Sequence, residues 1–284
     1  MSSYFRVPIT WSEVMRRTVK EIGDDNCLGL AAQLAFYFLM ALFPALLFLV
    51  ALIGYLPVEN ALSELLAALG TVAPQELVWL LRGQLAQIAG GSQASLLTLG
   101  IIGAIWSSSA AMVAIIDALN RAYDVTEWRP WWKRRLLAVL LTVALALFII
   151  VALTLVIVGP AMAFRFASWL DLGSAIALLW ALIRWPVILF CVVFSMDLVY
   201  HFAPNRRGRW VWITPGSLLA TALWIASSIV FRVYVTNFGD YTATYGAIGG
   251  AIVTMLWFYV SSIAILIGAE LNGVIEDAWR SVDS

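Results

Sequence analysis

Six long runs of apolar residues dominate the pattern of hydrophobic and polar positions along the chain. A helix rises about 1.5 Å per residue, so a run of about 20 apolar residues crosses a hydrocarbon core ~30 Å thick. The last run has no charged side chain at all. We therefore predict an all-α, polytopic membrane protein with six transmembrane helices, over Leu28–Gly54, Leu96–Ile116, Leu136–Val158, Ala175–Met196, Trp210–Val235 and Ala247–Ala269.

Two further stretches have the spacing of amphipathic helices. In Trp11–Ile22 the apolar and charged side chains fall on different sides of a helix. This pattern favours a helix lying on the membrane surface, with a solvated helix packed on a loop as the alternative. The first outer connection, residues 56–95, holds two leucine-rich stripes separated by Pro74. We expect two helices there that cap the outer face, either as a gate or packed on the bundle or on lipid.

The lysine and arginine residues predict the orientation in the membrane. Most of the 17 basic residues lie in connections on the side of the N-terminus, against Arg82 and Arg165 in the outer connections. Positive residues stay inside, so both termini are predicted to be cytoplasmic. The predicted domains are a cytoplasmic N-terminal region (1–27), a transmembrane domain that includes the outer cap (28–272) and a cytoplasmic tail (273–284).

The composition supports a lipid environment and excludes several functions. With 63% hydrophobic and 12% charged residues, the chain has too few polar side chains to cover a water-soluble domain. The 17 basic and 17 acidic residues cancel, which argues against nucleic acid as a partner. Cys27 and Cys191 lie in separate apolar runs, where we expect buried, unpaired thiols. With one histidine and neither a phosphate-binding loop nor a Gly-x-Ser-x-Gly elbow, we expect no metal, no cofactor and no enzymatic activity.

Arg184 is the most informative polar residue. It stands about ten residues inside the run Ala175–Met196, where a charge costs at least ~3 kcal/mol. Pro186 follows and is predicted to kink the helix. One interpretation is that Arg184 faces a polar cavity and binds an anionic group, such as a lipid phosphate or an organic anion. The other is a structural arginine that bonds to neighbouring spans or extends to the membrane surface.

Gln33 and Tyr37 lie one turn apart, early in the first span. Their polar atoms fall on one side of the helix, just inside the cytoplasmic edge. They either line the same pathway as Arg184 or form a hydrogen bond between helices. Together the three are the candidate substrate-binding residues.

Polar residues also gather where the spans meet the cytoplasm. Asp117 and Arg121 are four residues apart and can pair along one helix, and Glu270 can bond to Asn120 or Arg121. The cluster is either an inner gate or proton-coupled site, or a set of boundary residues that lock helix ends. Its members are Asp117, Asn120, Arg121, Glu270 and Asn272.

Gly246 and Gly250 are four residues apart at the outer start of the last span. Small residues at this spacing let a neighbouring helix approach closely. The contact can lie within one chain or between two, so the oligomeric state stays open.

Several short motifs follow one another along the chain: Ala31-Ala32-Gln33-Leu34-Ala35-Phe36-Tyr37, Phe43-Pro44, Asn120-Arg121-Ala122-Tyr123, Tyr200-His201-Phe202-Ala203-Pro204-Asn205, Pro215-Gly216, Tyr245-Gly246 and Glu270-Leu271-Asn272. Taken in this order, they resemble the BrkB/YihY family of bacterial inner-membrane proteins. The resemblance covers roughly Trp11 to Asn272. It implies a six-helix protein of the cytoplasmic membrane whose activity is unsettled and often suspected to be transport, in a family once mislabelled as a ribonuclease.

These observations together favour a transporter or lipid-translocating protein. Membrane lipids are its expected partners, and an anionic lipid or organic anion its expected substrate, held near Arg184. A scaffold in envelope assembly is the main alternative. A transporter needs a polar cavity that reaches the middle of the membrane, whereas a scaffold needs a dry core and an exposed patch.

Overall fold

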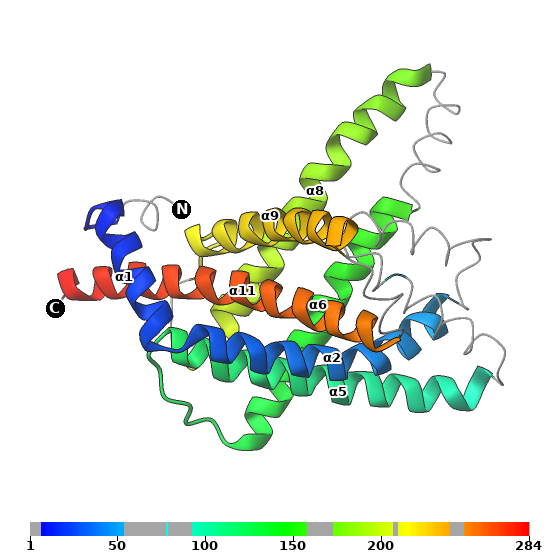
Figure 1. The fold of residues 1–284 in the computed structure, drawn as a ribbon, viewed down its shortest axis with the longest axis horizontal. Helices are drawn as coiled ribbons and strands as arrows, with labels where there is room; N and C mark the ends of the chain where they lie inside the picture. Colours follow the sequence, from blue (N-terminus) through cyan, green and yellow to red (C-terminus); the bar gives the residue numbers. More distant parts are fainter. Residues whose placement is uncertain are drawn as a thin grey trace.

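The computed structural model describes residues 7–53, 78, 93–157, 173–206, 210–238 and 247–283. Within these residues it contains seven α-helices and no strand, which confirms the all-α prediction (Figure 1). The helices are α1 (Trp11–Asp24), α2 (Cys27–Ile53), α5 (Gln93–Ala122), α6 (Trp131–Ile157), α8 (Gly173–Phe202), α9 (Pro215–Phe238) and α11 (Ala247–Asp283).

Every predicted apolar run falls on one of these helices. The main differences lie at the helix ends that are predicted to face the cytoplasm, called the inner ends below, because α11 continues to Asp283 and α9 begins only at Pro215. Proline has no backbone N–H to leave unsatisfied at a helix start, which explains the later beginning of α9. The amphipathic Trp11–Ile22 stretch forms α1, and Thr10 caps it by accepting a hydrogen bond from the Glu13 amide. The predicted outer cap lies almost entirely outside the described residues.

The apolar helices suit a membrane, but the exact number of spans stays a prediction. Four helices of the described part, α6, α8, α9 and α11, are long and apolar enough to cross a bilayer. The count rises to five if α1 and α2, which meet at an angle of 64°, form one broken span. Large apolar side chains stay exposed on several of these helices, as expected for lipid-facing surfaces. Examples are Leu140, Leu147, Leu182, Leu189, Ile229 and Val230.

The six longer helices pack in a closed cycle. Each of α2, α5, α6, α8, α9 and α11 contacts the next in sequence, and α11 returns to contact α2. In Figure 1, α2 and α5 run side by side, α9 lies along α11, and α8 leans away from these pairs. Between Leu182 and Phe190 most side chains of α8 are exposed, whereas Val193, Val199 and Tyr200 nearer its inner end are buried. The helices are therefore held together most firmly at the inner end of α8.

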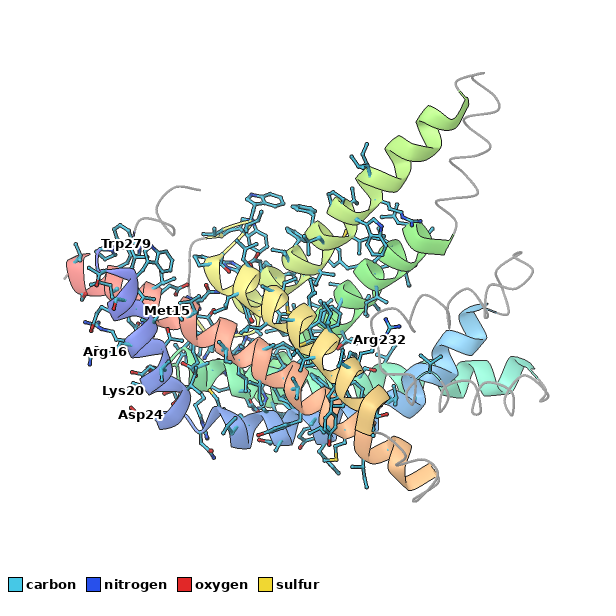
Figure 2. All side chains as sticks on the ribbon, turned by 45° about the horizontal axis from the view of Figure 1, so that its top comes forward. Met15, Arg16, Lys20, Asp24, Arg232 and Trp279 are labelled. Carbon is cyan, nitrogen blue, oxygen red and sulfur yellow. The ribbon has the colours of Figure 1, made fainter. Side chains whose placement is uncertain are left out.

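Helix α1 lies across the inner part of α11 (Figures 1 and 2). Val14 of α1 is fully buried with Leu271 and Ile275 of α11. Next to this contact, Arg16 and Lys20 stay exposed. Helix α1 thus packs on the last turns of α11, and this contact explains why α11 is helical well beyond its apolar run.

Helices α9 and α11 approach each other closely at glycines. A Cβ atom on Gly216 would overlap the carbonyl oxygen of Gly268, and a Cβ atom on Gly268 would lie 2.5 Å from the carbonyl oxygen of Gly216. Only glycine allows this contact. Of the predicted packing pair, Gly250 is buried in α11 and Gly246 lies outside the described residues, so their role stays a prediction.

Candidate functional site

A buried carboxylate joins the inner ends of α8 and α9. Asp197 of α8 is 1% exposed, and its Oδ1 accepts hydrogen bonds from the Thr214 hydroxyl (2.6 Å) and the Thr214 amide (3.2 Å). The Ser217 hydroxyl donates to the other carboxylate oxygen at 2.8 Å. Thr214 also caps α9, because its Oγ1 accepts from the Ser217 amide. The carboxylate thus sits at the positive end of the α9 dipole, which stabilises its charge.

Asn272 ties α11 into the same junction. Its side-chain oxygen accepts from the Gly216 amide at 2.9 Å, and its side-chain nitrogen donates to Thr214 Oγ1 at 2.9 Å. Asn272 is 1% exposed, so both bonds are made away from water. Three helices are therefore locked together where α9 begins.

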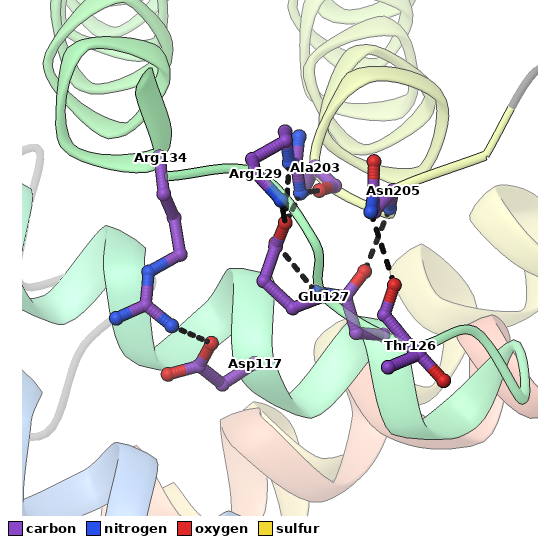
Figure 3. A network of polar contacts seen from close by, with 8 residues as sticks. Asp117, Thr126, Glu127, Arg129, Arg134, Ala203 and Asn205 are labelled. Carbon is purple, nitrogen blue, oxygen red and sulfur yellow. Dashed lines mark hydrogen bonds and ion pairs between the residues drawn. The ribbon is translucent and has the colours of Figure 1, made fainter. Parts of the chain in front are cut away.

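A second polar network connects the end of α5 with the segments that follow α5 and α8 (Figure 3). Glu127 accepts from Asn120 at 2.9 Å and from Arg129 at 2.6 Å, and Arg129 also donates to the Ala203 carbonyl. Asn205 donates its amide to Asn120 Oδ1 at 2.7 Å. Burial opposes the charged form of Glu127, but the hydrogen bonds from Arg129 and Asn120 outweigh it and hold the pKa of Glu127 below its usual range.

An open hollow of about 380 Å³ adjoins this network. Asp117 lies at its edge and pairs with Arg134 of α6 at 2.8 Å rather than with Arg121, which stays exposed. A pair along one helix is worth only a few tenths of a kcal/mol, so the spacing of Asp117 and Arg121 does not by itself determine the partner of Asp117. The hollow is lined by Asp117, Asn120, Arg121, Asp124, Val125, Thr126 and Glu127.

Glu270 has different partners from those predicted. It is 1% exposed, and its Oε1 accepts a hydrogen bond from the thiol of Cys27 at 3.1 Å instead of bonding to Asn120 or Arg121. The predicted inner cluster is thus divided into three neighbouring groups around Asn120, Asn272 and Glu270. The thiols of Cys27 and Cys191 are both free, as expected, but only Cys27 is buried, whereas Cys191 is half-buried.

Arg184 lies far from these groups. It is 13 residues before Asp197 on α8, about 20 Å along the helix. Its side chain is half-buried, its guanidinium carbon is 5.4 Å from the centre of the Trp185 ring, and its buried Nε has no hydrogen-bond partner among the described residues. Pro186 lies within α8, which continues through it without a break.

The structure does not join Arg184 to the other two predicted binding residues. Gln33 is exposed and Tyr37 is half-buried, both on α2, whereas α8 packs mainly on α6 and α9. No hydrogen bond within the described residues links either side chain to Arg184. A shared binding site for the three stays a prediction.

The sequence did not lead us to predict a site role for several other polar residues. Arg206 forms a largely buried ion pair with Glu276, and its guanidinium lies 3.9 Å from the centre of the Tyr123 ring. Thr214 and Ser217 flank Pro215-Gly216, a helix-start pattern that could have indicated the junction. Arg232 is a second arginine within an apolar helix, α9, and the reasoning applied to Arg184 would have found it (Figure 2).

Comparisons with known proteins place the chain among membrane proteins. A family model described as virulence factor BrkB matches residues 18–283. The ribonuclease-like protein YfkH of Bacillus subtilis (strain 168) is 37% identical over 253 residues, covering 89% of this chain and 91% of that protein. That label is uninformative about activity.

Two longer relatives are described as membrane proteins. A UPF0761 membrane protein of Nitrosospira multiformis is 27% identical over 94% of this chain, and one of Ralstonia nicotianae is 25% identical over 92%. The chain spans 62% and 58% of the length of these two relatives. No solved structure matches the chain.

Proposed function

Because the BrkB model matches nearly the whole chain, the chain belongs to the BrkB family of membrane proteins, and we propose that it translocates an amphipathic anion across the bacterial cytoplasmic membrane. An anionic phospholipid is the proposed substrate, and Arg184 binds its phosphate. Both termini face the cytoplasm in this proposal, as the distribution of lysine and arginine indicates.

The proposal rests on the side chains around Arg184 and on its unpaired Nε. Its neighbours Leu182 and Trp185 are 71% and 54% exposed, as expected for a helix surface in contact with lipid. A guanidinium in such a place has lost its water, and its Nε lacks a partner among the described residues. A phosphate would satisfy this donor with a charge-assisted hydrogen bond, while the acyl chains would cover the exposed apolar side chains.

The packing of α8 supports movement near Arg184. The inner end of α8 is fixed by Asp197, whereas few side chains between Leu182 and Phe190 are buried. Sparse packing permits a helix segment to shift at low cost. At the inner side, the hollow beside Asn120 and Arg121 provides the cytoplasmic exit of the proposed pathway.

Movement of labelled phosphatidylglycerol between leaflets of proteoliposomes tests the proposal. The wild-type protein should accelerate this movement over protein-free liposomes. Arg184→Gln should lower the accelerated rate at least about tenfold, because it removes a charge-assisted contact, whereas Arg184→Lys should retain part of it. Arg280→Gln, which changes an exposed arginine near the end of α11, is the matched control and should leave the rate unchanged.

The outcomes separate the alternatives. An unchanged rate in Arg184→Gln overturns the role of Arg184 and leaves translocation standing. A rate equal to that of protein-free liposomes for phosphatidylglycerol, phosphatidylcholine and a small organic anion overturns translocation and supports the scaffold. Movement of the organic anion alone replaces the lipid as substrate.

A further inference from the structure

Helix α6 begins with a turn that is both aromatic and basic. Its first residues, Trp131 and Trp132, are 74% and 52% exposed, and Lys133 after them is exposed as well. From Leu136 to Val151, in contrast, every exposed side chain of the helix is apolar. Tryptophan, lysine and arginine gather where a helix passes the lipid headgroups. The first turn of α6 therefore lies at the level of the headgroups, with the hydrocarbon region beginning directly after it.

Two basic residues of this turn have no carboxylate partner. Arg134 pairs with Asp117 of α5 at 2.8 Å (Figure 3). Lys133 and Arg135, on either side of it, form no ion pair with a carboxylate of the described residues; both lie on aromatic rings instead. The start of α6 thus carries two positive charges that the described part of the protein does not neutralise.

Trp106 of α5 holds the guanidinium of Arg135 in place. Arg135 Nη2 donates to the Trp106 carbonyl at 2.8 Å, and the guanidinium carbon lies 4.2 Å from the centre of the Trp106 ring. Lys133 Nζ similarly lies 5.3 Å from the centre of the Trp132 ring. Contact with an aromatic face attracts a cation and restricts its position, but it does not cancel the charge. Both charges are therefore positioned before any ligand arrives.

Arg135 has more hydrogen-bond donors than acceptors around it. A guanidinium carries five N–H donors. The bond to the Trp106 carbonyl is the one hydrogen bond that Arg135 makes within the described residues, and its buried Nε has no partner there. The planar group can place two parallel N–H donors on the oxygens of one phosphate. A phosphate ester is thus the anion that suits Arg135 at the depth of the headgroups.

The surface beside these cations is apolar on the side of the membrane interior. Trp106 and Ile105 of α5 are exposed, as are Leu136 and Leu140 of α6. The acyl chain of a lipid would cover such side chains, whereas a free phosphate ion would leave them bare. A zwitterionic headgroup carries a cation of its own and so neutralises less of the charge at Arg135. The surface therefore fits a phospholipid with a net negative charge.

We propose that Arg135 and Lys133, supported by Trp106 and Trp132, bind the headgroup of an anionic phospholipid in the cytoplasmic leaflet. Arg135 donates to the phosphate, and Lys133 adds a second attractive charge. The bound lipid neutralises the start of α6 where this helix meets α5. The site shares no residue with the surroundings of Arg184, so it does not depend on the proposed translocation.

Native mass spectrometry of the full-length protein in detergent tests the proposal, because it counts the lipids that stay bound. The measurement uses both the wild-type protein and Arg184→Gln, which lacks the proposed substrate site, so failure of either proposal leaves the other standing. In both proteins the first phosphatidylglycerol should bind at least about tenfold more tightly than the first phosphatidylcholine, since two basic side chains distinguish the headgroups.

Substitutions in the Arg184→Gln protein locate the site. Arg135→Gln should lower the affinity for phosphatidylglycerol at least about tenfold, because it removes a charge-assisted contact. Arg135→Lys should restore only part of it, because lysine lacks the two parallel donors. Lys133→Gln changes an exposed side chain that folding does not require, and should lower the affinity about fivefold. Arg280→Gln, an exposed arginine paired with Asp277, is the control and should leave the affinity unchanged.

Three results would overturn this assignment. Equal affinities for phosphatidylglycerol and phosphatidylcholine in the Arg184→Gln protein would reduce the turn to an unselective membrane anchor. Unchanged phosphatidylglycerol binding in both Arg135→Gln and Lys133→Gln would place the lipid elsewhere. Displacement of phosphatidylglycerol by an excess of glycerol phosphate, which has no acyl chain, would make the ligand a free phosphate ester rather than a lipid.

Discussion

At the scale of single residues, the polar groups at the inner ends were predicted as a set but not in their pairs. Asn120, Glu270 and Asn272 are all buried there. Their partners Glu127, Cys27 and Thr214 could not be predicted, because they lie at irregular separations along the chain or on other helices. Periodicity reports only neighbours within one helix.

Asp197 gives a prediction about stability. Asp197→Ala removes the acceptor for the buried Thr214 hydroxyl, whereas the Thr214 amide keeps the Ser217 hydroxyl oxygen as an acceptor and the Ser217 hydroxyl keeps the Thr214 carbonyl. One unsatisfied buried donor costs about 1–3 kcal/mol, and we expect the free energy of unfolding to fall by that amount. Unfolding of the purified protein in mixed micelles with increasing dodecyl sulfate measures it.

The matched control for this prediction is Asp24→Ala. Asp24 is exposed at the end of α1, and its ion pair with Lys20 is surface-exposed, so the change should stay within about 0.5 kcal/mol. Equal unfolding curves for the two alanine variants would contradict a locking role of Asp197.

At the scale of helices, the apolar runs located all six long helices, but the contacts between helices followed different rules. The predicted glycine pair rests on a spacing of four within one predicted helix. The close approach observed in the described residues joins Gly216 of α9 to Gly268 of α11, and no sequence spacing marks two glycines on separate helices. The extension of α11 past Ala269 was missed for a related reason, since its burial depends on contact with Val14 of α1 rather than on lipid.

Gly268 tests the importance of this crossing. In Gly268→Val, the Cβ atom would lie 2.5 Å from the Gly216 carbonyl oxygen and 2.7 Å from the Tyr200 hydroxyl, so α9 and α11 must separate. Overpacking of a rigid contact costs about 1–3 kcal/mol or more, and we expect a loss of at least that size in the same unfolding assay. Gly23→Ala, where a Cβ atom meets nothing within 4 Å, should be neutral or slightly stabilising because alanine favours a helix. A Gly268→Val protein as stable as Gly23→Ala would show that the crossing is not tightly packed in the membrane.

At the scale of the whole molecule, the all-α fold and its membrane character followed directly from apolar run length. The cyclic order of the helices could not be predicted, because the length of an apolar run contains no information about which membrane-spanning helices contact each other. The distribution of lysine and arginine adds an orientation that helix packing alone does not define.

That orientation is testable in cells. We expect a C-terminal fusion to a fluorescent protein to fluoresce and a C-terminal fusion to alkaline phosphatase to be inactive, because the phosphatase folds only outside the cytoplasmic membrane. The same pair of reporters attached after Arg165, in the predicted outer connection, should give the reverse result. An active C-terminal phosphatase fusion would contradict the cytoplasmic placement of the termini.

The packing of α1 on α11 has a consequence for biosynthesis. Val14 packs against Leu271 and Ile275, which the ribosome adds long after it has made α1. Until then the N-terminal helix has emerged without its final partner, and its exposed apolar residues Trp11, Met15 and Val19 are free to adhere to the bilayer. The contact between α1 and α11 thus forms only after α11 has been made, so a chain truncated before Leu271 would insert its earlier helices without forming this contact.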